Sequence, residues 1–246
     1  MKVKWKLLKT FLGILVLAFL VSFSAKRHAC KPLSDIKIKV DHESGKYFVN
    51  DSLVRRVVDG KQLRLSSLPL GNIDVAKVES VLDRNSFVSK SEVFRDIDGI
   101  MRIQINQETP VARVNTGLDE YYLSEQLTRI PLSNLYSAEV LMVGGNIEVQ
   151  DFAGIKELAE IVGADKLLKK HIIAVKKEKP NSFILLVNKG DYVIEFGELK
   201  NIESKFEKLK LFYDQYLGKV GLNYYERINL RFNNQIVATK RTNDEK

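Results

Sequence analysis

The chain has 246 residues, of which 45% are hydrophobic and 28% are charged, a composition that excludes a largely disordered protein. Its formal net charge is +8, but the basic residues are spread out and form no clustered basic and aromatic surface of the kind that binds nucleic acid. A single cysteine rules out an internal disulfide, so the fold must rest on packing.

One long apolar segment lies close to the N-terminus. Residues 7–24 carry a single charged side chain, Lys9, and the strongest apolar run extends from Phe11 to Phe23. A membrane span needs roughly 20 apolar residues, and Lys9 can reach the headgroups, so the segment predicts a transmembrane anchor. A cleaved signal peptide and a buried core helix are the alternatives.

The anchor interpretation also predicts a topology. A first apolar segment with so short a leading tail usually enters the membrane with its N-terminus inside, although basic residues on both sides give little bias. Residues 1–6 would then be a cytoplasmic tail, and the bulk of the chain would lie outside the cytoplasm. Basic residues concentrate only beside this segment and at residues 169–179. They suit binding to anionic lipid headgroups or cell-wall polymers, or they form a solvated face.

Residues 25–34 are polar and basic and contain Pro32, which predicts a short linker after the anchor. The cysteine of the chain, Cys30, falls in this linker. The residues before it lack the apolar side chain of a lipoprotein signal, so we interpret Cys30 as a free thiol.

A first folded domain is predicted over residues 35–107. Asp51 and Asp74 are suitable N-caps for two helices, and Asp98-Gly99 is a strong hairpin turn. The predicted order is a strand at 35–40, helices at 52–59 and 75–83, and strands at 88–97 and 100–107.

A second domain, over residues 108–240, is richer in strands, with residues 241–246 as a flexible tail. Strands are predicted at 111–114, 120–123, 138–143, 171–177, 183–188 and 192–196, and helices at 152–162 and 202–217. The second helix carries an apolar stripe of Ile202, Phe206, Leu209, Tyr213 and Tyr216, which predicts packing on a sheet. Residues 228–239 form either one bulged strand or two short strands about a tight turn.

The element order over residues 35–107 resembles a POTRA module, in which two helices pack on a three-stranded sheet. Later stretches resemble the bacterial cell-division family FtsQ, called DivIB in some lineages. They are Glu108–Ala112 followed by Tyr121–Leu123, Ile130–Leu132 followed by Val140–Gly145, and Ile228–Phe232 followed by Ile236–Val237. The chain departs from the family pattern at three places. Asn229 replaces the usual aspartate, Gln126-Leu127 stands where the family often has a glycine turn, and Lys240 lies where some members carry a tryptophan.

The resemblance implies an α+β fold: a single N-terminal transmembrane helix, a POTRA-like β-α-α-β-β domain, and a mixed β-sheet domain with covering helices. It implies a non-enzymatic divisome scaffold in the cell inner membrane at the septum, periplasmic in bulk, with no cofactor and no metal. The expected partners are FtsB/DivIC-like and FtsL-like coiled-coil division proteins, through which the family helps regulate septal peptidoglycan synthesis. Other divisome components are further candidates.

Partner binding in the family uses strand addition at the end of the β domain. An exposed edge strand offers unpaired N–H and C=O groups to a partner strand. On this model Phe232 and Ile236 offer apolar contact and Arg231 pairs with a partner carboxylate, although Phe232 could instead be core and Arg231 a solvated charge. The candidate residues are Arg231, Phe232, Asn234, Gln235, Ile236, Val237, Ala238 and Thr239.

An exported cell-wall hydrolase is the main alternative. Such an enzyme needs a nucleophile with a base, a carboxylate pair or a metal cluster, and His28, His42 and His171 lack the spacing of zinc ligands. A POTRA-type outer-membrane assembly component would need several modules or a barrel of many strands. The sequence therefore predicts a protein that is not an enzyme.

Overall fold

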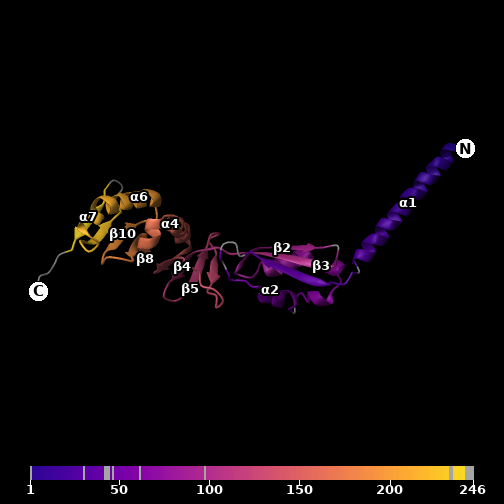
Figure 1. The fold of residues 1–246 in the computed structure, drawn as a ribbon, viewed down its shortest axis with the longest axis horizontal. Helices are drawn as coiled ribbons and strands as arrows, with labels where there is room; N and C mark the ends of the chain where they lie inside the picture. Colours follow the sequence, from indigo (N-terminus) through magenta and orange to yellow (C-terminus); the bar gives the residue numbers. More distant parts are fainter. Residues whose placement is uncertain are drawn as a thin grey trace. The chain divides into compact units, whose positions relative to one another are not determined.

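The computed structural model describes residues 2–29, 31–41, 45, 47–60, 62–96, 98–232 and 235–241. The chain forms two compact units, Met1–Gln107 and Glu108–Lys246, and each contains one β-sheet (Figure 1). Cys30, His42 and Asn234, which the sequence singled out, lie outside the described residues.

The N-terminal apolar segment is helical. Helix α1 (Lys2–Ala29) includes residues 25–29, which the sequence assigned to the linker. Alanine, lysine and arginine are favourable helix residues, so the polar residues after Phe23 continue the helix rather than end it. Within the described ranges, no helix has both the length and the apolar character that crossing a membrane requires.

The first unit has the predicted POTRA-like order. Its elements are β1 (Asp35–Val40), α2 (Asp51–Val58), α3 (Val75–Leu82), β2 (Val88–Arg95) and β3 (Ile100–Gln107), with short 3-10 helices at Leu65–Ser67 and Leu70–Asn72. The sheet has the order β1-β3-β2, with β1 parallel and β2 antiparallel to β3. Helices α2 and α3 bury Val54, Val58, Val78 and Leu82, and α2 lies on one face of the sheet (Figure 1).

Local signals explain where these helices begin. Asp74 is the N-cap of α3, as predicted, and its carboxylate accepts a hydrogen bond from the N–H of Lys77 at 3.1 Å. The N-cap of α2 is Asn50, which accepts from the N–H of Leu53 at 2.9 Å. The prediction of Asp51 as this cap was wrong by one residue, because aspartate is also favourable in the first turn of a helix.

The second unit is a nine-stranded mixed sheet covered by helices. Its strands are β4 (Pro110–Asn115), β5 (Glu120–Ser124), β6 (Arg129–Pro131), β7 (Leu141–Gly144), β8 (Ile172–Lys179), β9 (Ser182–Val187), β10 (Val193–Gly197), β11 (Tyr225–Asn229) and β12 (Val237–Lys240). Its order is β12-β11-β10-β9-β8-β7-β4-β5-β6. The longer helices are α4 (Phe152–Ala164), α5 (Lys166–His171) and α6 (Ile202–Phe212), followed by a π-helix (Tyr213–Leu217) and α7 (Gly218–Val220).

Two elements of this unit were missed from the sequence. Strand β6 has only three residues and ends in Pro131, so it shows no alternation. Helix α5 has six residues and buries only Leu168 fully. Most of its other residues are basic, so the sequence shows no apolar stripe that would predict a helix before β8.

The core of the second unit lies between the sheet and helices α4 and α6 (Figure 1). Of the apolar stripe predicted on the second helix, Ile202, Phe206, Leu209 and Tyr213 are buried, as expected. Tyr216 is 55% exposed, so its assignment to the core was wrong. The π-helix (Tyr213–Leu217) changes the angular spacing of the side chains, so Leu217 is buried where Tyr216 was expected.

We expect Phe206→Ala to lower the free energy of unfolding of the second unit by about 3–5 kcal/mol, because it empties a fully buried site. Phe206 is 1% exposed and packs against Phe196 with ring centroids 5.3 Å apart. Phe232→Ala is the matched control, because Phe232 is 47% exposed and its loss should change little. Chemical denaturation of the full-length chain measures both; equal losses would place Phe232 in the core.

Candidate partner-binding edge

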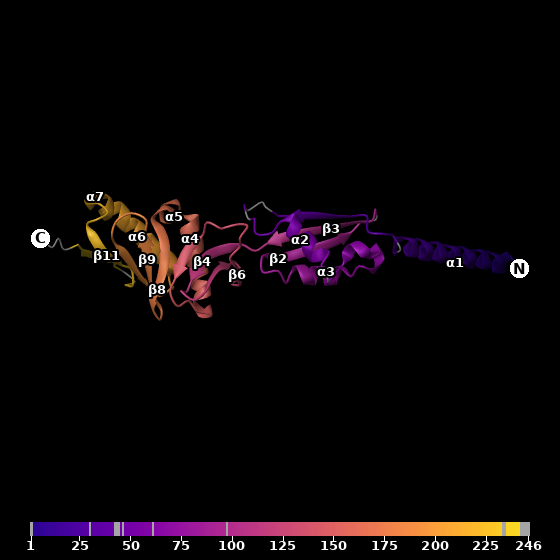
Figure 2. The same cartoon turned by 90° about the horizontal axis from the view of Figure 1, so that it is seen from below.

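The C-terminal segment forms two strands at one end of the large sheet. β11 runs parallel to β10 and β12 antiparallel to β11, with Asn229 opposite Val237 and Ile228 opposite Ala238. β11 lies near the C-terminal end of the described chain (Figure 2). Of the two structures that the sequence left open, two short strands is correct, since β11 ends at Asn229 and β12 begins at Val237. Asn233-Asn234, where a tight turn was predicted, lie outside the described residues. β12 pairs only with β11 and is therefore an edge strand.

Side chains on β12 alternate between two surroundings. Ile236, just before the strand, and Ala238 pack partly buried against the core. Val237 is 43% exposed, and Thr239 is exposed as well. No side chain among the described residues hydrogen-bonds to the backbone of Val237–Lys240, so no described side chain occupies the outer edge of this strand.

An apolar groove runs beside this edge. It has a volume of about 470 Å³ and lies between β11, β12 and the helical segment that precedes them. One wall is aromatic: the ring centroid of Phe212 lies 5.7 Å from that of Tyr216 and 5.5 Å from that of Tyr225. The apolar lining consists of Leu211, Phe212, Tyr216, Tyr225, Ile236 and Ala238, and the charged residues that line the groove are Lys208 and Lys240.

A buried hydrogen-bond chain supports the π-turn that forms one wall. The hydroxyl of Tyr192 donates to that of Tyr213 at 3.2 Å and lies 2.7 Å from Nε2 of His171. Burial raises the pKa of the Tyr213 phenol and lowers the pKa of His171, so both groups are neutral near pH 7. Tyr213 is thereby fixed in the core, while Tyr216, within the same turn, projects to the surface.

Glu195 on β10 organises the start of the connection between β11 and β12. Its carboxylate accepts hydrogen bonds from Arg227 at 2.8 Å, from the side chain of Asn229 at 2.7 Å and from Arg231 at 2.5 Å. The bond to Glu195 also raises the pKa of Arg227. Arg231, which the sequence assigned to a partner carboxylate, is therefore already paired within the domain, although its side chain is 51% exposed.

The other predicted site residues lie around the same edge. Phe232 is 47% exposed, and its carbonyl accepts a hydrogen bond from Nζ of Lys208 at 3.0 Å. Gln235 is exposed and lines the groove. Leu211 and Tyr216, which are 57% and 55% exposed, were missed as site residues. Tyr216 was assigned to the core with the rest of the apolar stripe, and Leu211 lies outside that stripe.

The opposite end of the large sheet has a different character. Its edge strand, β6, has only three residues, Arg129–Pro131. Short length and proline both limit strand pairing at an edge. Of the two edges of this sheet, β12 is thus the better suited to accept another strand.

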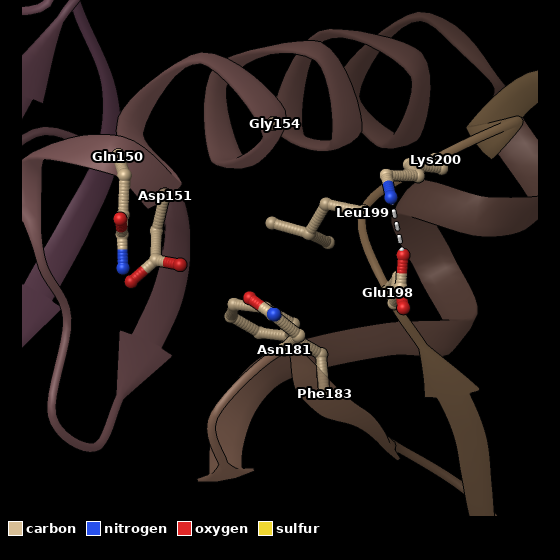
Figure 3. A pocket seen from close by; sticks show the side chains of 8 residues that line it. All are labelled: Gln150, Asp151, Gly154, Asn181, Phe183, Glu198, Leu199 and Lys200. Carbon is tan, nitrogen blue, oxygen red and sulfur yellow. Dashed lines mark ion pairs between the residues drawn. The ribbon is translucent and has the colours of Figure 1, made fainter.

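A second cavity of about 180 Å³ lies among the loops near the start of α4 (Figure 3). Glu198 pairs with Lys200 at 2.7 Å, and Asp151 pairs with the buried Lys177 at 2.6 Å. Leu199 reaches toward Gly154, where an added Cβ would lie 2.6 Å from the Cβ of Leu199. The Asp151 carboxylate therefore joins the start of α4 to β8, whereas the Glu198 pair lies exposed within one loop. Within the described ranges no three metal-binding side chains converge.

A POTRA-like domain followed by a mixed-sheet domain that ends in an exposed edge strand is the architecture of a protein-binding scaffold. The family model described as FtsQ/DivIB, C-terminal related, matches residues 109–239, and the POTRA-like domain model matches residues 30–106. The chain therefore belongs to the FtsQ/DivIB family, which confirms the resemblance seen in the sequence. No curated protein matches the chain.

Family membership assigns the chain a role in cell division. The family consists of non-catalytic scaffolds that act at the division septum through protein–protein interactions. Apart from Lys240, the last residue of β12, the mixed sheet lies within the residues that carry the family match.

We expect Glu195→Ala to lower the free energy of unfolding by about 1.5–3 kcal/mol, because three donors lose a largely buried charged acceptor. The side chain of Glu195 is 13% exposed. Glu198→Ala is the charge-matched control, since Glu198 forms only an exposed pair with Lys200 and should change stability little. Denaturation of the full-length chain measures both, and equal stabilities would show that the Glu195 cluster is not structural.

Proposed function

We propose that the chain is a bitopic scaffold of the cell-division machinery that binds FtsB/DivIC-like and FtsL-like coiled-coil partners and helps regulate septal peptidoglycan synthesis. The observation that carries this proposal is the β12 edge with an apolar groove beside it. The binding residues proposed are Arg231, Phe232, Asn234, Gln235, Ile236, Val237, Ala238 and Thr239, together with Leu211 and Tyr216.

Strand addition explains how such an edge would bind. A partner segment in extended conformation gains main-chain hydrogen bonds along β12, and its alternate side chains enter the groove. Leu211 and Tyr216 leave apolar surface exposed in water, which a partner's apolar side chains would cover. Coiled-coil proteins carry such side chains at regular spacing. Lys208 and Lys240 favour partner segments with acidic residues.

The N-terminal helix supports the proposed membrane location. Every large apolar side chain from Phe11 to Phe23 is between 48% and 66% exposed on α1, so nothing in the described chain covers this run. An apolar helix of this kind is stable in lipid or against another apolar helix. We propose residues 7–24 as a single-pass inner-membrane anchor, with residues 1–6 cytoplasmic and domains at 35–107 and 108–240 in the periplasm after the linker at 25–34.

We expect Leu211→Ala combined with Tyr216→Ala to weaken partner binding at least about tenfold, because buried aromatic and apolar anchors dominate interface energies. The test is recovery of small coiled-coil membrane proteins by the full-length chain from membrane extract of its own cell. The matched control combines Leu118→Ala with Val149→Ala, two exposed apolar residues away from the groove. Equal recovery by both variants would exclude the groove.

We expect Ile236→Pro to abolish strand addition, because proline removes one N–H donor and disfavours pairing at the start of β12. Ile236 precedes the strand and is only partly buried, so the domain should remain folded. Circular dichroism establishes the fold and the same recovery assay measures binding. Normal recovery by the folded variant contradicts strand addition here; activity on cell-wall polymer would favour a hydrolase.

A further inference from the structure

The sheet of the POTRA-like unit has an edge strand longer than β12. β2 pairs only with β3 in the order β1-β3-β2, so its other side is an edge. It has eight residues, whereas β12 has four. Phe94 on β2 is 52% exposed. A long edge strand with an exposed aromatic side chain would ordinarily be the stronger site for pairing with another strand.

Two carboxylates of α3 occupy this edge. The Oε1 atom of Glu79 accepts a hydrogen bond from the N–H of Val93 at 2.8 Å. The Oδ1 atom of Asp83 accepts from the N–H and from the hydroxyl of Ser91, both at 2.7 Å. These two N–H groups point away from β3 and are the donors that an added strand would use.

The spacing of the two carboxylates along α3 matches the spacing of the two N–H groups along β2. Glu79 and Asp83 are four residues apart, a rise of about 6 Å along a helix. Ser91 and Val93 are two residues apart, about 6.7 Å along a strand. Successive turns of α3 can therefore cap successive outward N–H groups of β2. The arrangement is a regular feature of the packing of α3 on β2.

The opposite edge of the same sheet is occupied in a similar way. Nη2 of Arg55, on α2, donates a hydrogen bond to the carbonyl of Ile36 at 3.1 Å. The N–H of Ile36 donates to the side chain of Asp35 at 2.8 Å. Charged side chains thus take up outward backbone groups on both β1 and β2, whereas no described side chain does so on β12.

We propose that Glu79 and Asp83 close the β2 edge of the POTRA-like domain to strand addition and so prevent pairing of β2 with the β2 strand of a second copy of this chain. Antiparallel pairing of two β2 strands about Ser91 places Lys90 of each copy opposite Glu92 of the other. Within one copy Lys90 pairs with Glu92 at 2.7 Å. In the antiparallel arrangement each of these charges would also face its opposite on the other copy, and opposite charges across strands favour pairing.

The test compares E79A/D83A with E79Q/D83N in the full-length chain in mild detergent. Analytical ultracentrifugation measures self-association, and amide hydrogen exchange measures protection in β2. The alanine variant should self-associate at least about tenfold more tightly than wild type, because hydrogen bonds to charged acceptors no longer compete. The amide variant keeps an oxygen acceptor at each position and should behave like wild type. D51A, at an exposed position in the first turn of α2, controls for loss of a negative charge in the same domain and should behave like wild type.

Two results would overturn the proposal. One is unchanged self-association of a folded alanine variant, and the other is an equal increase in the alanine and amide variants. Circular dichroism establishes folding. If E79A/D83A does not fold, D83A and D83N are compared by the same criteria, because Asp83 lies at the C-cap of α3 and its loss leaves the helix interior intact.

Discussion

Every open β-sheet ends in strands whose outward N–H and C=O groups lack a neighbouring strand, and each such edge must be covered, shortened or used. In the POTRA-like unit, Arg55 of α2 and the α3 carboxylates take up outward groups of β1 and β2. In the large sheet, β6 is short and ends in proline. β12 remains as the edge whose backbone forms no hydrogen bond with a described side chain. This difference makes β12 the edge best suited to the proposed strand addition.

The surroundings of β12 suit that use. The buried chain of His171, Tyr192 and Tyr213 holds a π-turn, and the turn leaves Tyr216 exposed beside Leu211. Glu195 on β10 accepts hydrogen bonds from Asn229, the last residue of β11, and from Arg231 just after it. These bonds fix the position at which the connection to β12 starts. The second unit thus combines a strand that has one open edge with an apolar groove beside it, and peptide recognition by strand addition uses both features.

Much of the fold could be predicted from the sequence, because its elements carry local signals. The Asp74 cap, the Asp98-Gly99 turn and the alternation in residues 100–107 gave the POTRA-like order. The three-residue strand β6 and the mostly polar helix α5 lack such signals. For the candidate site, the sequence indicated the last strand but not the groove. The spacing of Tyr216 predicts a core residue, and the π-helix that places its side chain at the surface has no sequence signal. The pairing of Arg231 with Glu195 joins distant residues and has no local pattern.

Amide hydrogen exchange of the full-length chain, with and without a coiled-coil division partner isolated from its own cell, tests the role of β12 most directly. Strand addition at β12 predicts that amides of Val237–Lys240 become protected on binding, while those of β2 and β6 do not change. Protection of β2 or β6, with Val237–Lys240 unchanged, would contradict the assignment of partner binding to the C-terminal edge.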